Sequence, residues 1–390
     1  MTPTIDALTA VGRDVAADVR AVYVHVPFCF HKCHYCDFYS FVDSQDRQPA
    51  YAARLRDEID AARSLLARPV DSIFVGGGTP TFLRPPVLRD ALGAIAAGVA
   101  RTPGAEWTVE ANPETVTDEV AGILVEFGVN RVSLGAQSFH VAHLKTLERW
   151  HDPASVARAV TALRRAGIRR INLDLIFGIP GETLDDWTSD VERALDFEIV
   201  HLSCYGLTYE PNTAMSKRLE RGHFEPCDEA LEAAMYERTM DLLERRGFEH
   251  YEISNWAKPG EACRHNLAYW RNLDWWALGP SASGHVGGTR FKNVPRISEW
   301  LASAGASPVV DVERVDEDRR FGELLMLGLR LCEGMDAAQV ERCCATSSGD
   351  ERRAAIARHE TGGLLERVGG RVRLTRRGKL LADEVLADLV

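Results

Sequence analysis

The sequence predicts an α/β fold built around a parallel sheet. Short β-rich segments alternate with helical stretches over the first half of the chain, at residues 21–26, 72–75, 107–110, 131–134, 171–175 and 200–204. Strands that alternate with helices pair in parallel through right-handed crossovers. Six repeats fall short of the eight that close a full barrel, so an open six-repeat barrel and a doubly wound sheet both fit.

The helices between these strands carry a regular apolar pattern. In the first of them, apolar residues recur at spacings of 4, 4 and 7, at Tyr51, Leu55, Ile59 and Leu66. Such spacings place side chains on one helix face, and we expect that face to cover the sheet. Polar residues concentrate directly after the strands, which is where parallel sheets bind their ligands.

The chain is expected to divide into four segments. Residues 1–20 form a loose leader, residues 21–215 the parallel α/β core, residues 216–295 a loop-rich extension with one long helix at 229–246, and residues 296–390 a C-terminal domain. The last segment contains three helices, a turn-rich hairpin around residues 368–370 and a final helix from Arg376. Helices followed by a small hairpin predict a smaller, mainly helical domain that resembles a winged helix.

Composition excludes several classes of function. The 390 residues include 46 basic and 57 acidic side chains, a net charge of −11. A chain with this balance and no basic–aromatic patch is not expected to bind nucleic acid. It shows no signal-peptide pattern and no apolar run of about 18 residues that would span a bilayer. We expect a cytoplasmic protein, whose nine cysteines serve a metal site and buried thiols rather than disulfides.

Three cysteines follow the first predicted strand in one short loop, at Cys29, Cys33 and Cys36. Thiolates are soft ligands that suit zinc or iron–sulfur clusters. Three ligands leave one iron of a four-iron cluster without a protein ligand, whereas electron-transfer clusters normally use four cysteines. The alternative is structural zinc with His31 or His34 as the fourth ligand. We favour the cluster, because no second ligand pair is apparent elsewhere in the sequence.

This loop and its flanks resemble the radical S-adenosylmethionine (SAM) superfamily. The pattern Tyr23-x-His25-x-Pro27-Phe28-Cys29 resembles the branch that contains oxygen-independent coproporphyrinogen III oxidase. The resemblance covers roughly residues 21–330 and implies an incomplete (β/α)6 barrel of TIM type. It also implies a [4Fe-4S] cluster on the three cysteines, whose open iron binds SAM.

The same resemblance implies a SAM pocket at the strand ends. Arg149 would pair with the SAM carboxylate and Asp174 with the ribose hydroxyls, while a glycine motif at residues 76–81 meets the amino group. An isolated acidic residue after a strand would rather be a capping or salt-bridge group, but four such strand ends meet at one rim. The implied cofactor-binding residues are Tyr23, Tyr35, Gly77, Gly78, Thr79, Glu110, Gln137, Arg149 and Asp174.

A later motif, His265-Asn266-x-x-Tyr269-Trp270, resembles the heme chaperone HemW family. That resemblance implies a protein that binds heme and passes it to acceptor proteins, membrane cytochromes among them, at the membrane periphery. It also allows a homodimer whose formation the cluster controls. A neutral imidazole is a good axial ligand for heme iron, so His265 is the predicted heme ligand, with Cys263 as a competitor. The alternative is a buried, hydrogen-bonded histidine in an aromatic core.

Two departures separate this chain from the porphyrinogen-decarboxylating enzyme. That enzyme continues its cysteine loop to a fourth cysteine where this chain has Phe38, and it carries a longer N-terminal segment. We therefore expect a heme chaperone. The main alternative is a coproporphyrinogen III oxidase-like radical SAM enzyme. An RNA-modifying radical SAM enzyme is a weaker alternative, because the charge balance disfavours it.

Overall fold

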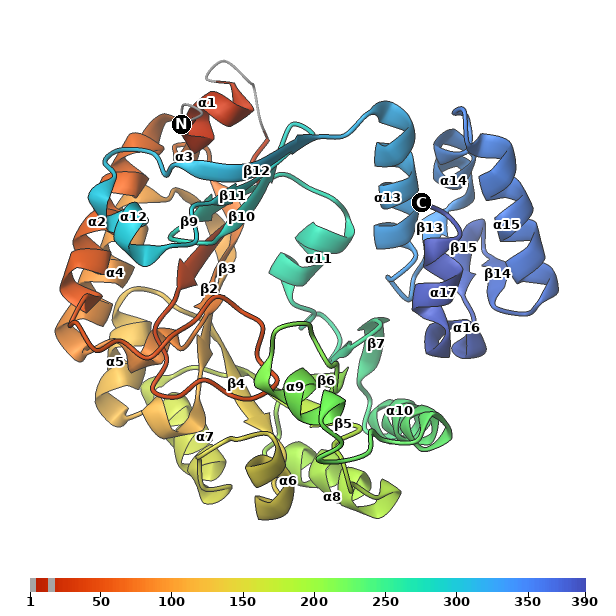
Figure 1. Ribbon diagram of the computed structural model, residues 1–390, viewed down its shortest axis with the longest axis horizontal. Coiled ribbons are helices and arrows are strands. Elements are labelled where there is room, and N and C mark those ends of the chain that lie inside the picture. The colour runs from red at the N-terminus through yellow and green to blue at the C-terminus, as the bar shows by residue number, and fades with distance from the viewer. Residues whose placement is uncertain (1–4, 13–17) are drawn as a thin grey trace.

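The computed structural model describes residues 5–12 and 18–390, and its centre is a long curved sheet (Figure 1). Twelve strands pair in the order β12-β11-β10-β9-β1-β2-β3-β4-β5-β6-β8-β7. Six neighbouring strands are parallel and follow one another in chain order: β1 (Ala21–Val26), β2 (Val70–Gly77), β3 (Arg101–Ala111), β4 (Arg131–Gln137), β5 (Arg170–Phe177) and β6 (His201–Gly206). All six predicted strands are present.

The consecutive order decides between the two expected architectures. A doubly wound sheet reverses its strand order at a switch point, whereas here every crossover moves to the next strand in the same direction. Right-handed crossovers then place the helices on one outer face, as Figure 1 shows. The outer helices are α2 (Gln48–Ala61), α4 (Pro85–Gly98), α5 (Asp118–Glu126), α7 (Ala154–Ala166) and α8 (Leu184–Leu195). The predicted partial TIM-type barrel is confirmed.

The apolar stripe of the first helix packs as predicted, with one difference in its bounds. Tyr51, Leu55 and Ile59 are buried on α2, while Leu66 belongs to a separate short helix, α3 (Arg63–Leu66). All four side chains join the main hydrophobic core between the helices and the sheet. The break after Ala61 therefore changes the path of the chain without exposing the stripe.

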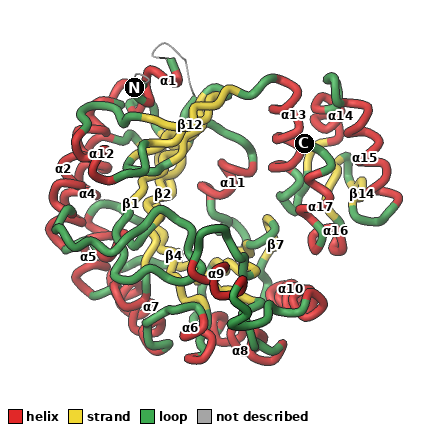
Figure 2. The backbone as a smooth tube through the Cα atoms, viewed as in Figure 1, coloured by secondary structure: helices red, strands yellow, loops and turns green. Residues whose placement is uncertain are grey.

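Antiparallel strands extend the barrel at both edges and leave it open. On one side β9 (Trp275–Leu278) still pairs in parallel with β1, and the antiparallel strands β10 (Ser283–Val286), β11 (Thr289–Asn293) and β12 (Val309–Arg314) follow it. On the other side lie the antiparallel strands β8 (Asn255–Ala257) and β7 (Glu249–Glu252). The edge strands β12 and β7 do not pair with each other. Helix α11 (Arg264–Trp270) lies in the space between the two edges, packed on β2 and α13 (Glu317–Gly328) (Figure 2). The long helix predicted at 229–246 is α10 (Glu229–Arg245).

The N-terminal segment is not a loose leader where the structure describes it. Helix α1 (Ala7–Val11) is capped by Asp6, whose side chain accepts from Thr9 N at 2.8 Å. Ala7 N donates to Ser307 O at 2.9 Å, and the apolar face of α1 joins the main core. The sequence pattern missed this docking because its partners come from the other end of the chain. Residues 1–4 and 13–17 lie outside the described part.

The C-terminal unit begins later than residue 296. Helix α12 (Ile297–Ala302) packs on α2 with Trp300 fully buried, and β12 pairs with β11. A second hydrophobic core includes Leu325, Val340 and Val372 and has no member before α13 apart from the partly buried Ile253. We therefore place the boundary of this unit near residue 315.

This unit combines helices with a small hairpin, and the single final helix expected from Arg376 is divided into two short helices. Three helices precede a hairpin whose two-residue turn is Gly369-Gly370, both with positive φ (58° and 79°), which a type I′ turn requires. A short strand completes a three-stranded sheet. The elements are α13, β13 (Met335–Asp336), α14 (Ala337–Cys343), α15 (Gly349–Thr361), β14 (Leu365–Val368), β15 (Arg371–Leu374), α16 (Arg376–Leu380) and α17 (Ala382–Ala387). No described helix is long and apolar enough to cross a membrane.

Candidate cofactor pocket at the cysteine loop

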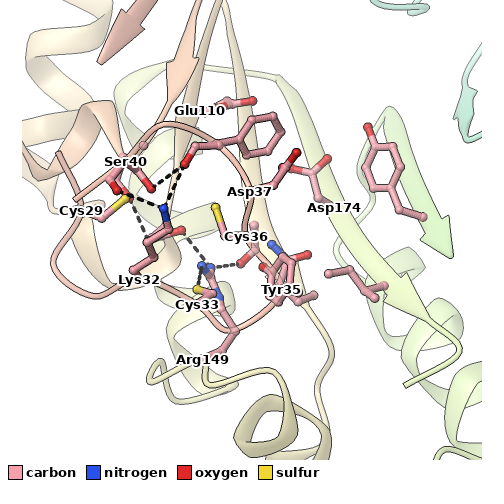
Figure 3. Close-up of a pocket in the computed structure, with 18 of the residues that line it drawn as sticks. Cys29, Lys32, Cys33, Tyr35, Cys36, Asp37, Ser40, Glu110, Arg149 and Asp174 are labelled. Atoms are coloured by element: carbon pink, nitrogen blue, oxygen red, sulfur yellow. Dashed lines mark hydrogen bonds between the residues drawn. The ribbon is translucent and has the colours of Figure 1, made fainter. Parts of the chain in front are cut away.

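A pocket of about 360 Å³ opens at the carboxyl ends of the parallel strands (Figure 3). The loop after β1 contributes the three cysteines, and the ends of β2 to β5 contribute polar side chains. All but two of the predicted site residues line it: Cys29, Cys33, Tyr35, Cys36, Gly77, Gly78, Thr79, Glu110, Gln137, Arg149 and Asp174. The carboxyl ends of parallel strands converge at one edge of the sheet, and this topology brings together residues that are 145 positions apart.

Backbone hydrogen bonds close the cysteine loop at its base. Cys29 N donates to Phe41 O and Phe41 N donates to Pro27 O, each at 3.0 Å. Inside the loop, the Lys32 ammonium donates to the Phe38 and Ser40 carbonyls, both at 3.3 Å. The loop is thus ordered by its own main chain, and its three free thiols project into the pocket.

The spacing of the thiols bears on the choice between zinc and a cluster. Sulfur atoms bound to one tetrahedral zinc at about 2.3 Å lie about 4 Å apart. Among the described residues, the sulfurs of Cys29, Cys33 and Cys36 do not form a set that lies within 4.8 Å of one another. Ligands on three different irons of a cube stand further apart than ligands on one ion. The three thiols are therefore not already arranged around a single tetrahedral ion.

Arg149 places a permanent positive charge beside the cysteines. It follows helix α6 (Val141–Thr146), and its Nη2 donates to Asn112 Oδ1 at 2.8 Å and to Gly135 O at 2.7 Å. Nη1 lies 3.5 Å from Cys33 Sγ, while its buried Nε has no hydrogen-bond partner. This guanidinium is held in one orientation and retains donor capacity for an anionic group in the pocket.

Two carboxyl groups face Arg149 across the pocket. Burial raises the pKa of Glu110 to about 7, although Gly77 N donates to its Oε2 at 2.9 Å. Burial also raises the pKa of Asp174, which accepts from Ser133 Oγ at 2.8 Å and from Asn172 Nδ2 at 2.7 Å. Burial destabilises the ionised form of each carboxyl group, and a ligand that brings a positive charge or a hydroxyl donor stabilises that form. The pocket therefore suits a ligand that carries both signs of charge.

The glycine motif has a packing reason that its sequence does not reveal. Gly77 has a φ of 104°, which favours glycine, and a Cβ at this position would overlap the His25 ring. A Cβ on Gly78 would lie 2.7 Å from the carbonyl oxygens of Val26 and Phe28. The motif therefore lets β2 lie close against the strand that leads into the cysteines, whether or not a ligand is bound.

Tyr23 does not line the pocket, contrary to expectation. Its hydroxyl lies 3.0 Å from His25 Nδ1, and His25 Nε2 lies 2.7 Å from Tyr39 O. Residues two apart on a strand face the same side, so Tyr23 lies one layer below His25, towards the barrel floor. There it stacks on Phe74, with ring centroids 6.3 Å apart. Its position supports the cysteine loop through His25 rather than flanking the sulfurs.

His265 is also absent from the pocket. Its side chain is only 1% exposed, its Nδ1 lies 3.1 Å from Ser72 Oγ, and its Nε2 lies 2.9 Å from Tyr269 Oη. Burial lowers its pKa to about 3. Both nitrogens of a neutral imidazole are thereby satisfied, and the ring stacks on Phe74. The geometry corresponds to the alternative we considered, a hydrogen-bonded histidine in an aromatic core, and does not support heme ligation.

Sequence reasoning missed a buried network that fixes this segment to the barrel floor. Arg131 Nε and Glu106 Oε2 are 3.0 Å apart, with side chains 1% and 0% exposed. Glu106 Oε1 also accepts from Cys263 Sγ and from His265 N, both at 3.3 Å. Cys263 is thus a donor within this network. The available signal was a charged residue next to apolar strand residues: Glu106 lies inside β3, and Arg131 is the first residue of β4.

Comparison with known proteins agrees with this arrangement. The radical SAM superfamily matches residues 23–194, and the HemN C-terminal domain matches residues 315–381, starting where the second core begins. The heme chaperone HemW of Mycobacterium tuberculosis is 37% identical over 378 residues, 95% of this chain and 94% of that protein. That of Bacillus subtilis is 33% identical over 371 residues, 94% of this chain and 98% of that protein.

The chain belongs to the heme chaperone HemW family.

A solved structure gives the fold of this HemW-family chain independent support. Coproporphyrinogen III oxidase (HemN) from Escherichia coli, described as a radical SAM enzyme, superimposes with a TM-score of 0.84. The match covers 98% of this chain and 92% of the enzyme at 20% sequence identity. At that identity the likeness establishes a shared fold. The position at which we expect that enzyme's fourth cysteine is Phe38 here, a side chain that lines the pocket and is 63% exposed.

Proposed function

We propose that this protein is a heme chaperone that binds heme, transfers it to acceptor proteins and carries a SAM-liganded [4Fe-4S] cluster. The observation that carries the proposal is the extent of the HemW match. Relatives named heme chaperones align with up to 95% of the chain, through both the barrel and the C-terminal unit. Membrane cytochromes as acceptors, a homodimer and a cytoplasmic location remain predictions.

The residues of the pocket fit the two cofactors. Cys29, Cys33 and Cys36 would hold the cluster, leaving one iron for SAM. Arg149 offers its guanidinium to the SAM carboxylate, and Asp174 offers carboxylate oxygens to the ribose hydroxyls. Glu110, next to the Gly77 main chain, lies where a carboxylate can accept from the SAM amino group. Cluster and SAM together supply one-electron chemistry, while these side chains bind and orient them.

The raised pKa of Glu110 makes SAM binding depend on pH. The carboxyl has a pKa of about 7 without a ligand, so it is ionised at pH 8 and mostly protonated at pH 6. Only the ionised form pairs with an ammonium group. We expect the dissociation constant of SAM to rise as pH falls below 7, approaching tenfold per pH unit, when measured by equilibrium dialysis on reconstituted protein.

The matched variant is Glu110→Gln. It should bind SAM more weakly at pH 8, by about 2 kcal/mol, and should lose the pH dependence between 6 and 8. An unchanged pH profile in this variant would assign the titration to another group and remove Glu110 from the SAM site.

We place heme against exposed aromatic side chains at the rim of the pocket. Phe30, Phe38 and Trp150 are 57%, 63% and 64% exposed, an unusual cost for large apolar groups. The indole of Trp150 stacks on His31 with ring centroids 4.2 Å apart, and Phe30 meets Trp150 edge-on at 6.1 Å. A flat porphyrin face can stack on such an aromatic surface. Beside it, the buried Nε2 of His31 has no hydrogen-bond partner.

Titration of the reconstituted protein with heme tests the proposed function and this placement. The wild type should bind heme with a shifted Soret band, and Trp150→Ala should weaken binding by about 1–2 kcal/mol through lost stacking. His265→Ala should bind heme like the wild type. It should instead lower the free energy of unfolding by about 2–4 kcal/mol, because Ser72 and Tyr269 lose their buried partner and a cavity forms.

Two results would change the assignment. Weaker heme binding in His265→Ala with unaltered stability would restore His265 as the ligand. A wild-type protein that binds no heme would overturn the chaperone proposal itself.

A further inference from the structure

A second group of metal-ligand side chains lies away from the cysteine pocket. His140 precedes helix α6, His143 lies on its first turn, and Asp186 lies on the first turn of α8. Each residue offers one ligand atom, and these three atoms all lie within 4.8 Å of one another. Among the described residues, no other group of three or more histidine, cysteine or carboxylate side chains does so. None of these three side chains lines the cysteine pocket, and none has a role in the heme binding proposed above.

The distances within this group are too long for hydrogen bonds. His143 Nε2 lies 3.6 Å from Asp186 Oδ2, and His140 Nδ1 lies 3.9 Å from Asp186 Oδ1. Hydrogen bonds of this kind are about 2.7–3.2 Å long. Two ligands that are each about 2.0–2.1 Å from one ion in tetrahedral geometry stand about 3.4 Å apart. The measured separations of 3.6 and 3.9 Å are close to that ligand spacing. Asp186 Oδ2 already accepts from Thr183 N at 3.0 Å and from Thr183 Oγ1 at 2.7 Å, which leaves Oδ1 as the oxygen for an ion.

A fourth residue completes the chemistry of the group. The Nε2 of His140, the nitrogen that faces away from Asp186, lies 3.6 Å from Asp190 Oδ1. Asp190 is itself buried and held by Ser138 Oγ and Phe139 N. Metal-binding histidines commonly donate their second nitrogen to a carboxylate, which fixes the ring and strengthens the ligand. The 3.6 Å separation is also longer than a hydrogen bond, so Asp190 would accept from His140 only after the ring moves towards it on binding a metal through Nδ1.

We propose that His140, His143 and Asp186 bind a zinc-class divalent cation, with Asp190 orienting His140. Two imidazoles and one carboxylate suit Zn²⁺, Co²⁺ or Ni²⁺ and disfavour Mg²⁺ and Ca²⁺, which prefer oxygen ligands. The ion would join α6 to α8. Leu147 N donates to His143 O at 3.0 Å and Arg149 N donates to Leu144 O at 2.8 Å, so this junction also steadies the turn that carries Arg149.

Metal analysis of the holoprotein tests the site with zinc as the probe. Reconstituted protein is incubated with a small excess of ZnCl₂ and separated from free zinc by gel filtration, and its zinc and iron are then measured per chain. The wild type should retain one zinc beside its cluster iron. His140→Ala should retain less than a tenth of that zinc with unchanged iron, and the exposed His223→Ala should match the wild type.

His143→Gln provides a second variant in case the first perturbs the fold. It should also lose zinc while keeping its iron, and zinc should raise the midpoint of thermal unfolding of the wild type only. The proposal is overturned by a wild type that retains no zinc, by His140→Ala that retains as much as the wild type, or by zinc that disappears only when the cysteines of the pocket are substituted.

Discussion

Serine in place of Cys33 is expected to abolish the iron–sulfur cluster. Cys33 is one of three thiols held by the closed loop after β1, and its sulfur lies 3.5 Å from the Arg149 guanidinium. Loss of one of three ligands leaves two irons without a protein ligand, and serine is a poor substitute for a soft thiolate. Anaerobically reconstituted wild type should hold close to four irons and four sulfides per chain, while Cys33→Ser should hold almost none.

The same result is expected for Cys29→Ser and Cys36→Ser. Cys227→Ser is a matched control, because this thiol lies outside the pocket and its loss should leave iron and sulfide unchanged. Stoichiometric zinc with no sulfide in the wild type would show that the loop is a zinc site.

Substitution of Arg131 should cause the largest loss of stability. Its ion pair with Glu106 is buried at both ends, and Nη2 also donates to Glu261 O at 2.7 Å. Arg131→Met leaves the Glu106 charge without its partner, and Arg170 Nη2 remains 3.8 Å away. Breaking a buried pair from one side costs about 3–5 kcal/mol, which urea unfolding of the holoprotein should reveal.

Two variants separate the buried charge from other effects of the substitution. Arg131→Met with Glu106→Gln should regain much of the lost stability, because no unpaired ion remains. Arg165→Met removes an exposed ion pair with Asp118, whose side chains are 67% and 65% exposed, and should cost less than about 1 kcal/mol. Equal losses for Arg131→Met and Arg165→Met would contradict a structural role for the network.

The parts of the fold that depend on local patterns were predictable from the sequence. Each strand of a parallel sheet is buried on both faces and reads as a short apolar run, so β1 to β6 were found. The cysteines lie within one loop, so their grouping is already present in the sequence. The strand-end residues converge because the topology repeats, which made Glu110 and Asp174 predictable as neighbours, whereas Arg149, which follows α6, was predicted only through the family resemblance.

Contacts between distant segments were not predictable in the same way. The structural role of His265 depends on its hydrogen bond with Ser72, which is 193 positions earlier in the chain. No pattern near residue 265 reveals that partner. Helix α1 docks on the segment near Ser307, and β12 joins the sheet through β11. The edge of the barrel and the boundary near residue 315 follow from these long-range pairings.

The measurement that tests the central claim most directly is heme transfer from a loaded, reconstituted preparation to an apoprotein with a known spectrum, such as apomyoglobin. The proposed function predicts that heme leaves the protein and appears in the acceptor, while the same preparation, given coproporphyrinogen III, SAM and reductant, forms no vinyl product. Failure to retain any heme, together with vinyl products formed at a useful rate, would contradict the chaperone and support a radical SAM oxidase.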